Sequence, residues 1–235
     1  MSAAAPPSAR LGALAAAVLP GRACADIGTD GGALPLHLLA SGRVPRAIGV
    51  DIAPAALAAA QARAPRLELR LGDGFSPLQP GEVATAVIAG MGGHRIAGIL
   101  AAGGAALRSV ERLVLSPHAD AAVVRAAARG LGLHLDDERL LAENGQWYVI
   151  LVYRWAGPGD LPPPATAADD AWGPLLRERR DPLLRAFLGA ELQRQAQACV
   201  AARAGGASAA ACARLDAGLA EIEAELARLA FSRPE

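Results

Sequence analysis

The sequence predicts an α/β fold in which a Rossmann-like sheet ends in an antiparallel hairpin and is followed by a C-terminal helical coiled-coil hairpin. Three observations support this prediction. Short apolar runs alternate with helical stretches from Ala23 to Arg154. Asn144-Gly145 joins two further β-like runs, and leucines with heptad spacing fill the end of the chain. Five β–α repeats imply a parallel sheet with right-handed crossovers.

The elements of the predicted sheet follow one another in a regular order. The expected strands are apolar runs bounded by Gly, Pro or Asp: Ala23–Ile27, Ala47–Asp51, Leu67–Leu71, Ala84–Ala89 and Leu113–Leu115. The expected helices lie between them: Ala33–Ala40, Pro54–Ala64, His94–Ala101 and Asp120–Gly130. Leu11–Leu19 predicts an amphipathic helix over the sheet, with a signal-peptide core as the alternative. Leu133–Leu141 and Gln146–Trp155 form the hairpin, because Asn-Gly favours a tight turn.

The last part of the chain has a different pattern. Residues 157–168 are predicted to be a stiff linker with three consecutive prolines, between a domain at 1–156 and a helical region at 169–235. The first helical stretch has one apolar face, formed by Leu183, Leu184, Phe187, Leu188 and Leu192. The second has apolar residues at heptad spacing: Leu215, Leu219, Ile222, Leu226 and Leu229. Gly205-Gly206 separates the two stretches, and Ser208 is placed to cap the second. The region is therefore predicted to be an antiparallel helical hairpin.

Composition limits the classes of function. The formal net charge is zero, so no overall field attracts nucleic acid. All 23 basic residues are arginine, which excludes lysine-based chemistry such as a Schiff base. Cysteines and histidines are scattered without a metal-ligand spacing, so no metal is expected. No run reaches the roughly 18 apolar residues of a membrane span, and we expect a cytoplasmic enzyme that is a monomer.

The segment Ala25–Pro35 is the most informative part of the sequence. A strand ends in acid-x-Gly, and Asp51 ends the next strand about twenty residues later, which is how doubly wound folds hold a nucleoside. Gly28 lets the backbone approach the ligand, and Asp51 is expected to accept from ribose hydroxyls or to cap the helix at Pro54. Asp30 replaces the middle glycine of a dinucleotide loop. Its carboxylate repels pyrophosphate, so S-adenosylmethionine, with its cationic amino-acid end, fits better than NAD.

Further candidate cofactor residues follow the later strands. Asp26 can hold the turn or meet the ammonium of a methionine moiety. Gly72-Asp73-Gly74 follows the third strand, where an acid commonly accepts from the adenine amino group, although a type I turn has the same sequence. The predicted cofactor-binding residues are Asp26, Gly28, Thr29, Asp51, Ile52, Asp73, Gly74, Ala89, Gly90 and Met91.

Candidate acceptor residues are placed at the same rim of the sheet. Asp30 is either a helix N-cap or a contact at the point of methyl transfer. His94 follows the fourth strand, and Ser116 and His118 follow the fifth, where a plain turn is the alternative. Arg177 begins a basic cluster in the tail, which gives weak support for RNA binding.

These segments resemble the TrmK family of tRNA adenine-22 N1-methyltransferases. The resemblance is carried by Ala25-Asp-Ile-Gly-Thr-Asp30, Leu34-Pro35, Gly72-Asp73-Gly74, Ile88-Ala-Gly-Met-Gly-Gly93 and Asn144-Gly145-Gln-Trp-Tyr148. It implies a class I methyltransferase sheet with a terminal hairpin, a C-terminal coiled coil, S-adenosylmethionine as donor and adenine N1 of a tRNA as acceptor. It also implies that Asp30 lies at the catalytic centre.

The sequence departs from the family pattern on the expected acceptor side. The family's Asp-His-Ala-Tyr-Leu-Pro is Asp-Gly-Gly-Ala-Leu-Pro here, so Gly31 and Ala33 replace a histidine and a tyrosine. The family's Gln-Pro-Asn is Ser116-Pro117-His118. Two alternatives therefore stay open. The acceptor is another RNA or a small molecule, or the chain is a non-catalytic RNA- or protein-binding module that retains a nucleoside pocket.

Overall fold

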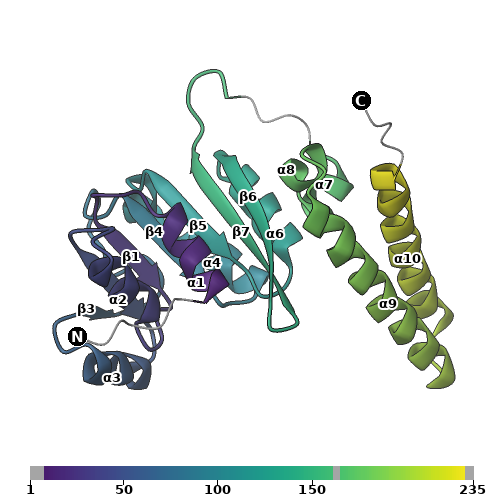
Figure 1. Ribbon diagram of the computed structural model, residues 1–235, viewed down its shortest axis with the longest axis horizontal. Helices are drawn as coiled ribbons and strands as arrows, with labels where there is room; N and C mark the ends of the chain where they lie inside the picture. The colour runs from purple at the N-terminus through teal and green to yellow at the C-terminus, as the bar shows by residue number, and fades with distance from the viewer. Residues whose placement is uncertain (1–7, 161–164, 231–235) are drawn as a thin grey trace. The chain divides into compact units, whose positions relative to one another are not determined.

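The computed structural model describes residues 8–160 and 165–230, which form two compact units with the boundary at Pro164 and Ala165 (Figure 1). Within the described residues of the first unit, seven strands form one sheet in the order β3-β2-β1-β4-β5-β7-β6. Its strands are β1 (Cys24–Ile27), β2 (Ala47–Asp51), β3 (Glu68–Leu71), β4 (Thr85–Ala89), β5 (Arg112–Ser116), β6 (Leu133–Glu143) and β7 (Gln146–Trp155). The first five are parallel, and β7 is antiparallel to both β5 and β6.

Helices cover both faces of this sheet. They are α1 (Ala9–Ala17), α2 (Ala33–Ala40), α3 (Pro54–Arg63), α4 (Gly93–Ala102), α5 (Gly104–Arg108) and α6 (Ala121–Gly130). Side chains of α1 and α2 pack with Cys24 and Val87 on one face, whereas those of α4, α5 and α6 pack with Ala25 and Ile88 on the other. Figure 1 shows α1 in front of the sheet and α4 and α6 behind it. Neighbouring strand residues point to opposite faces, so both faces of the central strands are apolar.

The predicted order of elements is confirmed. Each predicted strand of the sheet lies within two residues of an observed one, and the helix predicted at Leu11–Leu19 is α1, which packs on the sheet through Leu14 and Ala17. The short helix α5 was not predicted, because five residues are too few to show a helical period. None of the helices in residues 8–160 and 165–230 has the length and apolar composition that a membrane span needs.

The second unit is helical. It contains α7 (Ala167–Trp172), α8 (Pro174–Glu178), α9 (Pro182–Ala204) and α10 (Ala209–Ala230), and α9 and α10 pair through side chains that include Leu184, Leu188 and Ile222. The Ser208 hydroxyl accepts from Ala211 N as expected of a cap. The linker boundary predicted at residue 168 is wrong, because Thr166 caps α7 and makes Ala167 helical. The proline run at 162–164 lies outside the described residues.

Arg177 connects three helices of the second unit. Its Nε and Nη2 donate to the two oxygens of Glu225 on α10, both at 3.0 Å, and Nη1 donates to Asp169 on α7. Glu225 is only 4% exposed, so the pairing satisfies a buried carboxylate. The substrate contact predicted for Arg177 is therefore not supported. Its guanidinium is already used to hold the helical unit together.

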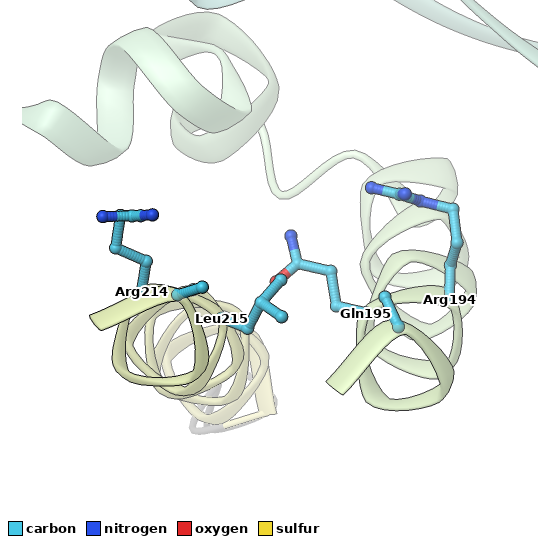
Figure 2. A pocket seen from close by; sticks show the side chains of 7 residues that line it. Arg194, Gln195, Arg214 and Leu215 are labelled. Carbon is cyan, nitrogen blue, oxygen red and sulfur yellow. The ribbon is translucent and has the colours of Figure 1, made fainter. Parts of the chain in front are cut away.

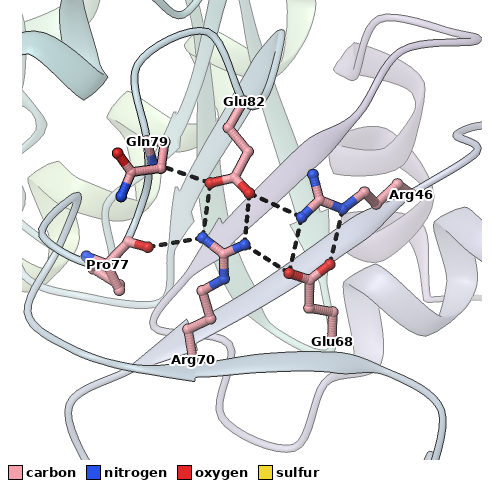
Figure 3. A network of polar contacts seen from close by, with 6 residues as sticks. All are labelled: Arg46, Glu68, Arg70, Pro77, Gln79 and Glu82. Atoms are coloured by element: carbon pink, nitrogen blue, oxygen red, sulfur yellow. Dashed lines mark hydrogen bonds and ion pairs between the residues drawn. The ribbon is translucent and has the colours of Figure 1, made fainter.

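A network of ion pairs stabilises the β3 edge of the sheet (Figure 3). Arg46 donates to Glu68 and Glu82, and Arg70 donates to the same two carboxylates at 2.5–2.7 Å. The Glu82 side chain is 12% exposed. Hydrogen bonds from Arg70, from the Gln79 backbone and from Arg46 lower the pKa of Glu82 to about 2, although burial opposes this. The network thus joins the starts of β2 and β3 to the loop before β4.

We expect Glu82→Gln to destabilise the first unit by about 1–3 kcal/mol at pH 7, because it leaves Arg70 without its main anionic partner. The folded pKa of Glu82 lies below its ordinary value, so this contribution is present above about pH 4.5 and is lost as the pH falls toward 2. Urea unfolding at pH 7 and pH 3 measures it. Glu111→Gln is the matched control, since the Glu111–Arg22 pair is 50% and 56% exposed and should contribute under about 1 kcal/mol. Equal effects of the two substitutions would contradict a special role of the network.

Candidate nucleoside site at the carboxyl edge of the sheet

A cleft lies where β1, β2, β3 and β4 end. It is lined by Ile27, Gly28, Asp51, Ile52, Gly72, Asp73, Gly74, Met91, Arg95 and Ile99, and its empty volume is about 240 Å³, including space open to solvent. The strand order reverses between β1 and β4, and ligands of open α/β sheets bind at this switch point. Six of the ten predicted cofactor residues line the cleft: Gly28, Asp51, Ile52, Asp73, Gly74 and Met91.

A second hollow lies between α9 and α10 of the helical unit, with an empty volume of about 780 Å³ that includes open solvent. Figure 2 shows Gln195 reaching from α9 toward Leu215 of α10, with Arg194 and Arg214 pointing to the same side. The lining residues include no carboxylate, histidine or thiol. Arg194 pairs with Glu191 of its own helix. The cleft at the sheet is therefore the better candidate for chemistry.

Gly28 brings the backbone close to the cleft. Its φ is +77°, and a Cβ at this position would lie 2.0 Å from Cε of Met91. A side chain at residue 28 is thus disfavoured by the backbone conformation and would require the Met91 side chain to move. The Met91 side chain covers Gly28 and accounts for the small volume of the cleft there. Methionine is unbranched and has three rotatable bonds, so it can turn aside for a ligand at low energy.

Asp26 is a buried carboxylate next to Ile27, which lines the cleft. It is 7% exposed, and Thr29 Oγ1 donates to its Oδ2 at 2.8 Å. Burial raises the pKa of Asp26 to about 6, and Asp51 adds to the rise, whereas the Thr29 hydrogen bond and the charge of Arg10 oppose it. At neutral pH the group is an incompletely solvated anion. A cationic ligand would stabilise it.

Asp51 connects the first two strand ends. Its Oδ1 accepts from Ala53 N at 2.9 Å and its Oδ2 from Asp30 N at 3.1 Å. The carboxylate thus holds the turn before α3 and remains half-buried in the wall of the cleft. It does not cap α3, because the N-cap is Ala53 and no side chain caps this helix. Each carboxylate oxygen has further acceptor capacity, so ribose binding is compatible with this role.

Asp30 does not cap α2. The N-cap position is Gly32, and the Asp30 side chain has no hydrogen-bond partner within the described part of the chain. Its φ is +46°, a conformation that few non-glycine residues adopt and that is frequent at functional sites. The residue is exposed at the edge of the sheet. The structure therefore contradicts the capping interpretation and leaves the carboxylate free to meet a ligand.

The far end of the cleft offers apolar surface and one acid. Ile52 is 53% exposed, and Asp73 is an exposed lining residue of the same cleft. No hydrogen bond to the Asp73 carboxylate occurs among the described residues. An exposed branched side chain in the same cleft as a free carboxylate suits a flat ring that carries an amino group.

The predicted acceptor residues have different environments. His94 is exposed in the first turn of α4, and His118 is exposed after β5 with its backbone N–H bonded to Met91 O. Burial of the ring and the charge of Arg10 lower the pKa of His118, which favours the neutral imidazole. Ser116 is 1% exposed, and its hydroxyl has no partner in the described structure. Direct contact between Ser116 and an acceptor is therefore not supported, because the side chain lies below the rim.

Two residues at this rim were not predicted as site residues. The Arg10 guanidinium lies over the Tyr148 ring with Cζ 4.8 Å from the centroid, and the His118 and Tyr148 ring centroids are 6.1 Å apart. Sequence reasoning missed Arg10 because it lies in the first turn of a helix and belongs to no recognisable binding motif. Tyr148 was noted only as part of the hairpin. No cluster of three or more His, Cys, Asp or Glu residues able to hold a metal occurs in residues 8–160 and 165–230.

Comparison with known proteins agrees with this geometry. A family model described as "Methyltransferase domain" matches residues 7–151. The chain is 34% identical over 151 residues to the Bacillus subtilis tRNA (adenine(22)-N(1))-methyltransferase. That match covers 62% of this chain and 63% of the relative, which is less than two thirds of the relative's length.

Solved structures match over more of the chain. The Bacillus subtilis m1A22 tRNA methyltransferase TrmK is 27% identical, with a TM-score of 0.78 over 95% of this chain and 97% of that chain. The Streptococcus pneumoniae protein Sp1610 in complex with S-adenosyl-L-methionine is also 27% identical, with a TM-score of 0.80 over 93% and 99%. The resemblance to the TrmK proteins is confirmed, and the chain belongs to the family that this methyltransferase domain defines.

Proposed function

We propose that the chain transfers a methyl group from S-adenosylmethionine to N1 of an adenine in tRNA, at the position equivalent to nucleotide 22. One observation carries the proposal: a cleft at the carboxyl edge of the sheet, lined by Ile27 and Asp51, whose neighbours are the buried carboxylate of Asp26 and the unpartnered exposed carboxylate of Asp30. The TrmK relatives named above support the choice of donor and acceptor. A tRNA substrate places the protein in the cytoplasm, and the expectation that it is a monomer stays a prediction.

The residues of the cleft fit the proposed cofactor. Asp51 is placed for the ribose hydroxyls, Asp73 for the adenine amino group and Ile52 for the adenine face. Asp26 would complement the ammonium of the methionine end, which explains why a carboxylate is kept in a site that raises its pKa. Gly28 gives the methionine end room, with the Met91 side chain turned aside. When bound, S-adenosylmethionine supplies an electrophilic methyl group on its sulfonium sulfur.

The reaction needs positioning more than a strong base. The lone pair of adenine N1 forms the new bond to carbon while the sulfur–carbon bond breaks, and the electron pair stays on sulfur as a neutral thioether. The base gains the positive charge, and no proton has to leave. Asp30 is placed to orient the base through its exocyclic amine and to offset the developing charge. A paired or stacked target base must first be exposed, at roughly a few kcal/mol.

The small residues that follow Asp30 are also compatible with a second class of acceptor. Gly31 and Ala33 offer no side chain able to bind a base edge. Another RNA or a small molecule is therefore the alternative acceptor. Incubation with labelled S-adenosylmethionine and bulk tRNA, followed by nucleoside mass analysis, separates the cases. 1-Methyladenosine supports the proposal, and cofactor binding without any methylated nucleoside contradicts it.

Asp30→Asn should lower kcat for tRNA methylation about 100-fold, because the amide removes the negative charge that offsets the developing cation. The dissociation constant of S-adenosylhomocysteine should change less than about twofold. Asp73→Asn is the matched control, an exposed carboxylate at the same edge that should weaken cofactor binding and leave kcat at saturation nearly unchanged. Full turnover of Asp30→Asn would exclude the proposed role. Single-turnover methylation assays measure both variants.

Cofactor affinity should fall at acid pH. Only ionised Asp26 complements the ammonium, and the pKa of Asp26 in the free protein is about 6. Binding should thus be constant above about pH 7 and weaken roughly tenfold for each unit below 6. Calorimetric titration with S-adenosylhomocysteine from pH 5 to 8 tests this. Asp26→Asn should bind more weakly at pH 8 and lose the pH dependence. An unchanged profile in this variant would assign the titration to another group.

A further inference from the structure

Asp30 lies in a short loop with an unusual backbone. The loop joins β1 to α2, and within it Asp30 and Gly32 have φ angles of +46° and +72°. A left-handed conformation is strained for a residue with a side chain, and it persists only where contacts hold it. One hydrogen bond inside the loop runs from Gly32 N to Thr29 O at 2.9 Å. This bond spans Asp30 without involving it, so contacts from other elements hold Asp30 itself.

Two side chains from outside the loop hold the backbone around Asp30. Asp51 Oδ2 accepts from Asp30 N at 3.1 Å, and Arg63 Nη1 donates to Gly31 O at 3.1 Å. Asp51 ends β2 and Arg63 ends α3, so each reaches the loop from a different element. The bond from the guanidinium is charge-assisted and therefore stronger than one between neutral groups. The Asp30 N–H and the Gly31 C=O are thus both fixed from outside the loop.

Gly31 leaves the space that the Arg63 guanidinium fills. A Cβ at residue 31 would lie 2.9 Å from Nη1 and 3.4 Å from Cζ of Arg63. Gly31 is not among the residues with positive φ, so its backbone conformation does not require glycine. Its lack of a side chain instead allows the guanidinium to approach. Where the family pattern has a histidine, this chain thus has a guanidinium supplied by α3.

The contact between Arg63 and Gly31 can be studied apart from cofactor binding. Arg63 is exposed, and it forms no ion pair within residues 8–160 and 165–230. It is also not one of the residues that line the cofactor cleft, whereas Asp51 is. Removal of Asp51 would therefore disturb the loop and the cleft together. Removal of Arg63 takes away only a support of the Asp30 loop.

We propose that Arg63 is a positioning residue for methyl transfer. It holds the Gly31 carbonyl and thereby keeps the Asp30 carboxylate where the acceptor base binds. The proposal rests on the proposed function, in which Asp30 orients the adenine and offsets its charge. Transfer requires reacting atoms about 3–3.5 Å apart, and a displacement of about 1 Å can lower the rate about 100-fold. Arg63 touches neither the cleft nor the reacting atoms, so it acts through Asp30.

Arg63→Ala should lower kcat for tRNA methylation about 10- to 100-fold, because Asp30 loses its fixed position. The KM for tRNA and the dissociation constant of S-adenosylhomocysteine should change less than about twofold. Arg63→Lys keeps a donor of similar reach and should recover most of the lost turnover. Arg66→Ala is the matched control and should behave like the wild type, because the exposed Arg66 side chain has no hydrogen bond or ion pair in the described part of the chain. Methylation assays and calorimetry measure these constants, and circular dichroism confirms folding.

A double-mutant cycle separates positioning from general support of the fold. In an Asp30→Asn background, Arg63→Ala should lower kcat by less than about a further twofold, because the group that Arg63 positions is already disabled. Gly31→Ala tests the same contact from the other side, since its methyl group would meet the guanidinium at 2.9 Å. It should lower kcat several-fold in the wild type and leave the Arg63→Ala protein unchanged.

Three results would overturn the positioning role while the wild type remains active. The first is an unchanged kcat in Arg63→Ala, and the second is a pair of losses in Arg63→Ala and Asp30→Asn that multiply in the double variant. The third is a raised KM for tRNA at unchanged kcat, with a salt dependence of tRNA binding reduced by about 0.7–0.9 in slope, which would assign Arg63 to an RNA phosphate. Wild-type protein that methylates no tRNA would instead contradict the proposed function itself.

Discussion

The parallel pairing of β1 with both β2 and β4 is the constraint on which the rest of the site depends. In the observed register Ile27 lies beside Val50 on one side and Ile88 on the other. The three strands therefore end at one edge, and the loops that follow them, at Gly28, Asp51 and Gly90, meet there. Helices cover both faces of these strands, so the faces are not accessible to a ligand. The ligand-binding groups therefore lie in the loops at the carboxyl ends of the strands.

The site contains groups that are unfavourable in the free protein. Asp26 is a carboxylate in a buried position, Asp30 has a left-handed backbone, and Arg10 has a buried donor with no partner. Each of these features costs free energy that packing elsewhere has to offset.

Arginine–carboxylate pairs stabilise both units in a chain without lysine. Arg46 and Arg70 hold the β3 edge, Arg125 pairs with a buried Glu138 between α6 and β6, and Arg177 joins α7, α8 and α10. The guanidinium fork can bridge two carboxylates or two oxygens of one carboxylate. For this reason Arg177, which the sequence makes available for RNA, is used inside the protein, as is Arg125. Their use in internal ion pairs is consistent with the zero net charge of the chain.

The sequence by itself determined the order of strands and helices, the terminal hairpin and most of the cleft. These follow from local pattern: the period of the apolar residues, the Asn-Gly turn, and acids and glycines at strand ends. The tertiary structure decided which charges are free. Nothing local distinguishes Arg177, which is paired with Glu225 of another helix, from Arg10, which lies unpaired over Tyr148. Likewise Ser116 is buried and Asp30 exposed because of how distant segments pack. Partners far apart in the chain set burial and ion pairing, and only the folded structure brings them together.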